Sequence, residues 1–441
     1  MVSLRAVIPA AVAACCVLLA GSLYVHGDRE LYHALLEGWG AFPFRTPFLD
    51  MHAVTSAVEC HRLGFDVFVQ NPCDVLKRVH AYSPLWLRLA VFPITTAWDN
   101  ALGLGTVAAF LLALPFLPPS RGWWETAVIT LGSISSVVAF ALERANIDLL
   151  VFLLTMVAVA LTRRSWQLRM PGYAVAVLAG MLKFYPVTLL ILAVRERLAV
   201  CAAIGAVSLG TIGVWFAVDG REILRGMANI PTTSYFDDNV FGMRNLPFGL
   251  AQIFGLSHLE AEALLIALLV AMFAGAVRLA RWDDLALRLR CLTEAEATYL
   301  LVGCVLMVGC FLAAQNGLYR AIHFLFVLPA LTAMARTGSG RDFNVWLFST
   351  IGLIMLLMWS SAIRMLIETV LARLGVSTQP TGMAHFDIWL VRELMWWVVV
   401  ALLTSLLMRL IWESRAGQDA ARLFPGTHAR RDVIRPVSHS G

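Results

Sequence analysis

The stretch PGYAVAVLAGMLKFYPVTLLILAV, residues 171–194, is long and apolar enough to enter a bilayer, yet it contains Lys183 and Pro186. Both of its flanks are basic, in RRSWQLR (163–169) and RER (195–197). Because basic loops stay on the cytoplasmic side, a single crossing does not connect two such flanks. A proline breaks a helix, and a lysine at mid-bilayer costs about 2.5–3.5 kcal/mol. We therefore predict a re-entrant helical hairpin over 171–194, in which Lys183 and Pro186 have structural roles and Lys183 lies toward the cytoplasmic half.

Similar apolar stretches recur along the whole chain. Hydrophobic residues make up 59% of the 441 residues and charged residues 14%, with a mean hydropathy of +0.75. This composition predicts an all-α polytopic membrane protein, with one transmembrane domain over 1–413 and a polar cytoplasmic tail over 414–441. Besides the hairpin, about ten spans are predicted, at 1–27, 101–118, 124–141, 147–162, 198–217, 261–280, 297–314, 321–335, 345–366 and 389–411.

Two segments leave alternatives open. The N-terminal stretch 1–27 also has the pattern of a cleaved signal peptide, although we favour a first transmembrane helix because the apolar run is long and many spans follow. The segment PLWLRLAVFPITTAW, residues 84–98, is short and contains Arg88 and Pro93. It is interpreted as re-entrant or interfacial; a true span there would reverse the topology before the hairpin.

The basic residues orient the chain. The net charge of +5 arises from basic residues in short loops between spans, which is the positive-inside pattern and not that of a nucleic-acid binder. With the hairpin re-entrant, the basic loops all fall in the cytoplasm, as do both termini. The extracytoplasmic segments are then 26–100, 218–260 and 367–388, with the short turns 143–148 and 315–320.

The first extracytoplasmic loop contains the first candidate residue. After Pro47, residues 48–63 have the pattern of a short amphipathic helix that Gly64 ends. Asp50 falls in its first turn. One interpretation is a carboxylate that simply favours the start of a helix. The functional interpretation is a general base at the membrane surface.

The same loop contains Cys60 and Cys73. Because an extracytoplasmic compartment permits oxidation, we expect these two residues to form a disulfide that ties the helix to the Asn-Pro-Cys-Asp turn. Two free thiols are the alternative.

Other polar residues lie where predicted spans meet the outer face. Arg144 and Asn146 lie in the 143–148 turn, and Tyr319, Arg320 and His323 lie at the start of a later span. An arginine and a histidine three apart share a helix face and can bind a phosphate. Interfacial charges and an aromatic belt with a snorkelling arginine are the plainer alternatives. A further phosphate-binding candidate, Arg244, lies in the 218–260 loop.

Cofactor and metal motifs are not found in the sequence. Asp237 and Asp238 are adjacent and do not form an Asp-x-Asp pair, and no His-x-x-x-His, Cys-x-x-Cys, P-loop or Rossmann fingerprint occurs. We expect no metal and no cofactor.

In their order along the chain, these motifs resemble those of the polyprenyl-phosphate-sugar-dependent membrane glycosyltransferases, in the branch with the alpha-mannosyltransferases of bacterial envelope glycolipids. The resemblance covers residues 1 to about 335. The matching pieces are Asp50, Gly64-Phe65-Asp66, Asn71-Pro72-Cys73-Asp74, Tyr82-Ser83-Pro84, Asn146, Lys183-Phe184-Tyr185-Pro186 and Tyr319-Arg320-Ala321-Ile322-His323.

This resemblance implies a GT-C fold and an inverting transfer on the extracytoplasmic face, with Asp50 as general base. Arg320 and His323 would stabilise the leaving lipid phosphate. The expected partners are a polyprenyl-phosphate sugar donor, a lipid or glycan acceptor and membrane lipids, with no nucleic acid. The alternative is a transporter or flippase of a lipid-linked or amphipathic substrate, although paired broken helices in matching halves are not apparent.

Overall fold

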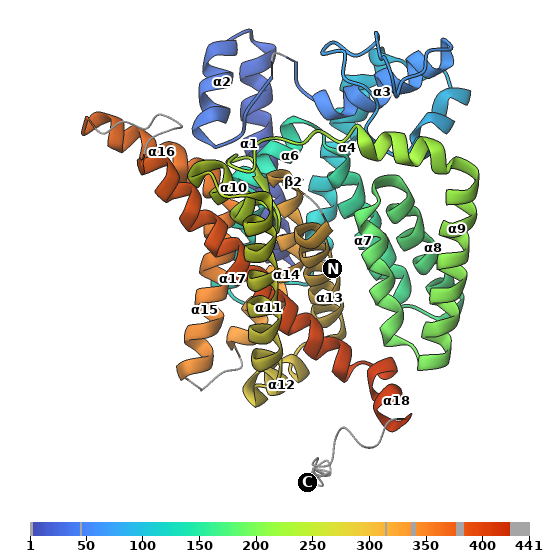
Figure 1. Cartoon of the computed structure of the whole chain (residues 1–441), viewed down its shortest axis with the longest axis vertical. Coiled ribbons are helices and arrows are strands. Elements are labelled where there is room, and N and C mark those ends of the chain that lie inside the picture. Colours follow the sequence, from blue (N-terminus) through green and yellow to red (C-terminus); the bar gives the residue numbers. More distant parts are fainter. Residues whose placement is uncertain (1–2, 45, 314, 337–340, 376–382, 424–441) are drawn as a thin grey trace.

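The computed structural model describes residues 3–44, 46–313, 315–336, 341–375 and 383–423, and its regular structure is almost entirely helical (Figure 1). The elements up to residue 228 are α1 (Leu4–Val25), α2 (Arg29–Gly38), α3 (Leu49–Arg62), the 3-10 helices η1 (Pro84–Val91) and η2 (Thr96–Trp98), α4 (Asp99–Ala113), η3 (Leu114–Phe116), α5 (Trp123–Ser133), α6 (Ser136–Glu143), α7 (Ile147–Thr162), α8 (Trp166–Lys183), η4 (Tyr185–Arg195) and α9 (Leu198–Ala228).

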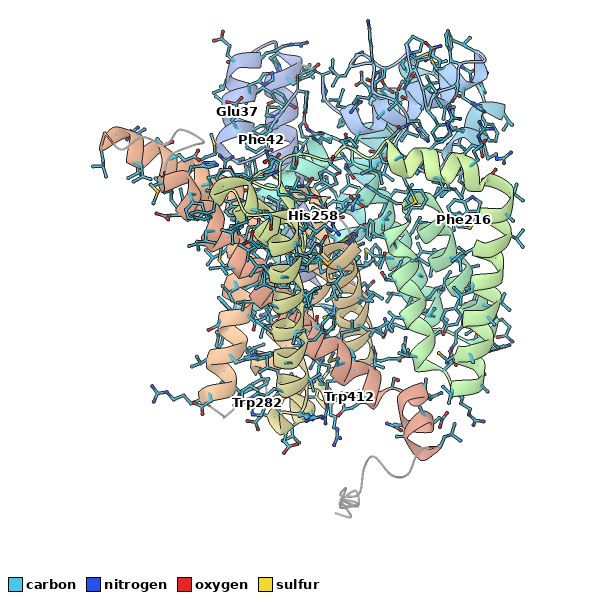
Figure 2. The ribbon with its side chains drawn as sticks, viewed as in Figure 1. Glu37, Phe42, Phe216, His258, Trp282 and Trp412 are labelled. Carbon is cyan, nitrogen blue, oxygen red and sulfur yellow. A yellow bond between two sulfur atoms is a disulfide. The ribbon has the colours of Figure 1, made fainter. Side chains whose placement is uncertain are left out.

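The later elements are β1 (Val240–Phe241), α10 (Asn245–Phe254), α11 (His258–Ala280), α12 (Asp283–Arg290), α13 (Glu294–Ala313), β2 (Asn316–Gly317), η5 (Leu318–His323), α14 (Phe324–Arg336), α15 (Arg341–Met358), α16 (Ser360–Arg373), α17 (Met383–Glu413) and α18 (Arg415–Leu423). In Figure 1, α2 and α3 lie together at one end of the molecule, and α12 and α18 lie at the opposite end. Figure 2 shows Glu37 and Phe42 at the α2–α3 end and Trp282 and Trp412 at the other.

Within the described residues, eight helices are long and apolar enough to cross a membrane, or nine if the bent pair α5–α6 is one span. This confirms an all-α, multi-pass architecture. The predicted span 147–162 corresponds to α7, whose 16 residues give a length of about 24 Å, short of a hydrocarbon core of about 30 Å. The count of ten therefore stays a prediction. The predicted span 345–366 was wrong in its extent, because α15 ends at Met358 and α16 begins at Ser360.

The core of the bundle is formed by α13 and the η5–α14 segment. In the apolar stretch of each segment, 78% of the residues of α13 and 83% of those of η5–α14 are buried inside the molecule. The corresponding share is 11% for both α1 and α9. Helices that are apolar all round but exposed face lipid, whereas α13 and α14 are surrounded by protein. The polar residues at the start of η5 are therefore held by the most enclosed part of the structure.

The predicted hairpin is present and slightly longer than expected, from Trp166 to Arg195. Helix α8 ends at Lys183, Phe184 turns the chain with a left-handed φ of 62°, and η4 runs back along α8. The close approach needs a glycine at position 180, where a Cβ would lie 2.9 Å from the Val187 Cα. At the open end of the hairpin, Arg169 Nη1 donates to Glu196 Oε1 at 3.1 Å. The start of α8 and the end of η4 therefore lie at the same end of the molecule.

Lys183 lies at the tip of the hairpin, and not near its basic open end as expected. Its ammonium group contacts Asn146 and Asp148 at the start of α7 and not the basic end of the bundle. The 18 residues of α8 rise about 27 Å, which is nearly the thickness of a hydrocarbon core. A half-length hairpin was assumed in the prediction.

The predicted cytoplasmic basic residues meet at one end of the bundle. Arg5 donates to the Arg121 carbonyl, and Arg195 pairs with Glu294. Helix α18 joins the same end, where Asp419 accepts a hydrogen bond from the Leu198 amide at the start of α9. Of the predicted tail 414–441, residues 424–441 lie outside the described part of the chain.

The break between α5 and α6 is stabilised by two tryptophans. The helices bend by 44°. Trp39 Nε1 donates to the Ile134 carbonyl at 2.8 Å, and Trp359 Nε1 donates to the Leu131 carbonyl at 3.2 Å. These bonds satisfy carbonyls near the break, as irregular backbone at membrane depth requires.

The predicted first outer loop, 26–100, contains α2, α3 and the two short 3-10 helices. Helix α3 matches the predicted amphipathic helix, and Gly64 follows it with a φ of 88°. In the segment 84–98, the eight-residue η1 is too short to cross a membrane, and η2 is the first turn of the candidate span Thr96–Phe116 that continues into α4. The second outer loop is shorter than predicted because α9 continues to Ala228, where Arg225 and Asn229 bind the first loop. Of the predicted loop 367–388, residues 376–382 lie outside the described part.

Candidate functional site

The start of α3 fixes Asp50 against the turn between α6 and α7. Phe48, just before the helix, has a left-handed φ of 61° and no side-chain cap. Its amide donates to the Glu143 carbonyl at 2.8 Å, and the Asp50 amide donates to the Arg144 carbonyl at 3.2 Å. First-turn amides of a helix lack partners within the helix, so these two bonds supply them. They also tie the main chain of residue 50 to that of residues 143–144.

The Asp50 carboxyl group is buried, at 6% exposure, and surrounded by donors. Asn146 Nδ2 donates to Oδ2 at 2.5 Å. On the other oxygen, Oδ1, Arg144 Nη1 lies at 3.4 Å and Arg78 Nη1 at 3.7 Å. A buried carboxylate is tolerated only with such partners, so Asp50 is more than a residue that favours a helix start.

Asn146 connects this carboxyl group to a second one. It is the N-cap of α7, and its Oδ1 accepts hydrogen bonds from the Asp148 amide at 2.9 Å and from Lys183 Nζ at 3.0 Å. Each polar atom of the Asn146 side chain thus faces a different functional group. The side chain bridges the first outer loop and the hairpin tip.

Asp148, fully buried, is the centre of the second half of the site. Lys183 Nζ lies 2.8 Å from its Oδ2, and the Arg320 Nε lies 3.6 Å from the same oxygen. Tyr185 donates to Oδ1 at 2.7 Å, and its oxygen lies 2.7 Å from His323 Nε2. Because the hydroxyl hydrogen is given to Asp148, His323 Nε2 carries the proton in this arrangement. We call the connected residues the Asp50 network: Arg78, Arg144, Asn146, Asp148, Lys183, Tyr185, Arg320, His323 and Asp50 itself.

Aromatic rings position the cations of the network. The Arg144 guanidinium lies 4.6 Å from the ring centres of both Phe44 and Phe140. Lys183 Nζ lies 5.5 Å from the ring of Tyr319, and the Arg320 guanidinium lies 5.0 Å from that of Tyr185. Such contacts stabilise a cation by about 0.5–2 kcal/mol and hold it where a ligand could meet it.

Arg78 connects the network to the disulfide loop. It forms a two-pronged pair with Asp74, with Nη2 at 2.8 Å from Oδ2, and Nη2 also donates to the Leu49 carbonyl at 2.8 Å. Burial alone would raise the pKa of Asp74, but the hydrogen bond and charge of Arg78 outweigh it and hold the pKa below its usual value. Asp74 is therefore a carboxylate that keeps Arg78 directed at Asp50.

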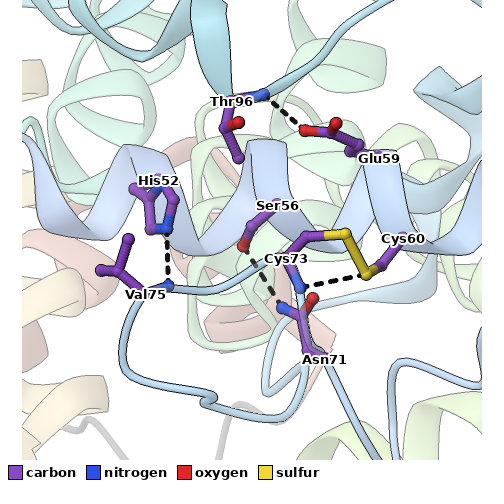
Figure 3. Close-up of a disulfide and its surroundings, with 8 residues drawn as sticks. All are labelled: His52, Ser56, Glu59, Cys60, Asn71, Cys73, Val75 and Thr96. Atoms are coloured by element: carbon purple, nitrogen blue, oxygen red, sulfur yellow. Dashed lines mark hydrogen bonds between the residues drawn. A yellow bond between two sulfur atoms is a disulfide. The ribbon is translucent and has the colours of Figure 1, made fainter.

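The predicted disulfide between Cys60 and Cys73 is present (Figure 3). Around it, Asn71 Nδ2 donates to Ser56 Oγ at 3.2 Å, and the Val75 amide donates to His52 Nε2 at 3.0 Å. These contacts bind the 71–75 turn along one side of α3. Because Asp74 in this turn pairs with Arg78, the position of Arg78 is fixed relative to the helix that contains Asp50.

Most of the predicted site residues meet in this network, but Arg244 does not. Asp50, Arg144, Asn146, Arg320 and His323 are members of the network, and Tyr319 borders it. Arg244 instead pairs with Glu262 on α11 at 3.3 Å and lies over Phe248. The start of η5 is placed by the β1–β2 pair, in which Val240 is opposite Gly317.

Sequence reasoning missed Arg78, Asp148 and Tyr185 as members of the site, and gave Lys183 the wrong place. The spacing of Asp74 and Arg78, four residues apart, is one signal that could have indicated a pair. Asp148 faces residues from the hairpin and η5, which are far apart in the sequence, and no local pattern reveals such contacts.

The network joins a buried carboxyl group, Asp50, to the cationic side chains of Lys183 and Arg320 and to the Tyr185 hydroxyl, which come from distant parts of the sequence. Such a pairing suits a reaction in which one group loses a proton while another develops negative charge. Within the described residues, no group of three or more His, Cys, Asp or Glu side chains could hold a metal ion.

Comparison of the chain with protein-family models, with curated protein sequences and with solved structures gives no match. Its function is therefore argued from the site itself.

Proposed function

We propose that this protein is an integral-membrane glycosyltransferase of the GT-C type. It would move a sugar from a polyprenyl-phosphate donor to a hydroxyl of a lipid or glycan acceptor, with inversion and without a metal or cofactor. The observation that supports this most strongly is the continuous connection from the Asp50 carboxyl group through Asn146 to Lys183, Asp148, Arg320 and His323.

Asp50 is the proposed general base. Its carboxylate takes the proton of the acceptor hydroxyl as that oxygen forms a bond to the anomeric carbon. The bond between that carbon and the phosphate oxygen breaks, and the phosphate keeps the electron pair. General-base help of this kind contributes about 10²–10⁴ in rate. Asn146 and Arg144 hold the carboxyl group in one orientation.

The leaving lipid phosphate needs charge stabilisation on the other side of the sugar. Lys183 and Arg320 are the closest cations to the second half of the network, and the hydrogen-bonded His323–Tyr185 pair lies beside them. Both cations are already directed by Asp148, so they need little reorganisation when the phosphate charge develops.

The face on which the reaction occurs follows from charge. Asp50 lies on α3, at the α2–α3 end (Figure 1), whereas basic residues gather at the start of α13, where Arg195 pairs with Glu294 and Arg336 pairs with Glu296. Under the positive-inside rule, the network faces the extracytoplasmic side of a bacterial inner membrane.

A transfer assay tests the proposal. Purified protein in detergent would receive polyprenyl-phosphate-[14C]mannose and a total lipid extract, and labelled lipid products would be separated from the donor. We expect the wild type to form a labelled product and both Asp50→Asn and Asp50→Ala to lose transfer, about 10²-fold or more, with the fold retained.

Asp219→Asn is the matched control, because Asp219 pairs with the exposed Arg88 at the far edge of the first loop and should leave the rate unchanged. Wild-type rates from either Asp50 variant would refute the proposal. Movement of labelled lipid across a vesicle membrane without formation of product would favour a flippase instead.

A further inference from the structure

His385, in the first turn of α17, lies between two carboxyl groups from other elements. The residue is buried, at 8% exposure. Its Nδ1 is 3.4 Å from Glu368 Oε1 on α16, and its Nε2 is 3.3 Å from Asp238 Oδ2 in the second outer loop. A neutral imidazole has one N–H group and one lone pair, whereas the protonated ring donates from both nitrogens. Both contacts are therefore favourable at once only when His385 is protonated.

Two arginines and a third acid complete the charged surroundings of His385. Arg364 on α16 contacts the same two carboxyl groups, at 3.1 Å and 3.5 Å. Arg392, two turns further along α17, lies 3.6 Å from Asp238 and 2.7 Å from Glu393. Because an arginine keeps its charge at every relevant pH, loss of the proton from His385 weakens this junction without breaking it.

The junction lies at the end of the molecule that contains Asp50. The Arg364 guanidinium is 5.7 Å from the ring centre of Phe42, which Figure 2 shows at the α2–α3 end. In the proposed orientation this end faces the extracytoplasmic side. The pH of that compartment therefore acts on His385.

The main chain after Asp238 connects the junction to the proposed phosphate site. The Asp238 carbonyl accepts a hydrogen bond from Arg392. The carbonyl of the next residue, Asn239, accepts a hydrogen bond of 2.8 Å from the Leu318 amide. Leu318 begins η5, which contains Arg320. A shift of Asp238 would therefore be passed on to the segment that contains two members of the Asp50 network.

We propose that His385 is a positioning residue whose protonation ties α16, α17 and the second outer loop together and thereby holds η5 in place. Histidine changes charge between about pH 5 and 8, so the junction is tight on the acidic side of this range and looser on the basic side. The inference rests on the proposed function in giving η5 a part in catalysis. The effect of the proton itself needs no substrate.

Hydrogen–deuterium exchange measures the junction directly. Purified protein in lipid nanodiscs would be labelled at about pH 5.5 and about pH 8, with labelling times scaled for the intrinsic effect of pH on amide exchange. In the wild type we expect the amides of α16 and of residues 316–323 to exchange about fivefold faster at the higher pH.

Two substitutions of His385 separate charge from shape. His385→Lys keeps a positive charge with several donors, so both segments should stay protected at both pH values. His385→Gln does not titrate, so both segments should exchange at the faster rate at both pH values. His258→Gln is the matched control, because His258 is exposed and lies 4.0 Å from Glu262, and it should keep the wild-type response.

Glu368→Gln provides a second route if variants of His385 fail to fold. It retains an oxygen that accepts from Arg364 but has no charge, and it should reduce the pH response of α16.

Three results would overturn the inference. They are a wild type without a pH response in α16, a full response in His385→Gln or Glu368→Gln, and a response in α16 that residues 316–323 do not follow. Because none of these readouts depends on transfer, failure here is distinct from failure of the proposed function.

Discussion

Asn146 donates a hydrogen bond of 2.5 Å to the Asp50 carboxylate. A single amide group thereby sets the orientation of the proposed base, while its oxygen holds Lys183 and caps α7. The positioning and the capping can be separated by substitution.

Asn146→Ser should retain the helix cap but lose the bond to Asp50. We expect transfer to fall about 10²-fold, because a base misplaced by about 1 Å loses that much, while Tm stays near the wild type. Asn146→Ala should lose both, with a further cost of about 1 kcal/mol in unfolding free energy. Rates and thermal melts of the two variants in one detergent provide the measurement. A serine variant with full activity would contradict a positioning role.

Lys183→Met should destabilise the protein strongly. It leaves the fully buried Asp148 carboxylate without its closest cation, which costs about 3–5 kcal/mol. Adding Asp148→Asn should recover much of the loss. Arg88→Met, which removes the exposed pair with Asp219, is the control and should cost less than about 1 kcal/mol. Thermal melts in detergent compare the wild type, Lys183→Met, Lys183→Met/Asp148→Asn and Arg88→Met. Similar losses of stability from Lys183→Met and Arg88→Met would contradict this prediction.

His80 should make the first loop acid-sensitive. Burial lowers the pKa of His80 to about 4, and its Nε2 lies 3.2 Å from the Ser83 carbonyl. Since the unfolded imidazole binds a proton near pH 6.5, stability should fall as pH drops from about 6.5 to 4, by about 3 kcal/mol in total. The lowered pKa of Asp74 keeps that carboxylate ionised through this range.

His80→Gln retains a donor for Ser83 and does not titrate. Melts from pH 7 to 4.5 should show a steeper decline for the wild type than for this variant. Parallel curves would assign the acid sensitivity elsewhere.

Loss of the Cys60–Cys73 disulfide should loosen the loop that carries Arg78. For a closed loop of this size the expected cost is about 3 kcal/mol. The Cys60→Ser/Cys73→Ser protein should melt at a lower temperature and transfer more slowly, and dithiothreitol should bring the wild type to the same level. Cys15→Ala, in the exposed part of α1, is the control. A wild type insensitive to the reductant would argue against this role.

The sequence predicted the features that depend on local pattern. Basic flanks around 171–194 predicted a hairpin, and the spacing after Pro47 predicted α3. The depth of the hairpin was misjudged because Lys183 was treated as a residue to be kept near the basic end. Its ion pair with Asp148, from a helix with another orientation, cannot be found by local pattern.

The remaining differences have the same cause. The break at Trp359 that separates α15 from α16 depends on contacts with α5, and Arg244 was grouped with the site only because it lies in an outer loop. Both depend on which helices become neighbours, and periodicity along one segment does not contain that information.

The backbone pairing of residues 48 and 50 with residues 143 and 144 has one consequence for engineering. Since main-chain atoms anchor the start of the helix that bears Asp50, side chains on the neighbouring helices can be redesigned without breaking this anchor. Under the proposed function, new specificity could therefore be selected from libraries at side-chain positions on the neighbouring helices while the Asp50 carboxyl group stays in register.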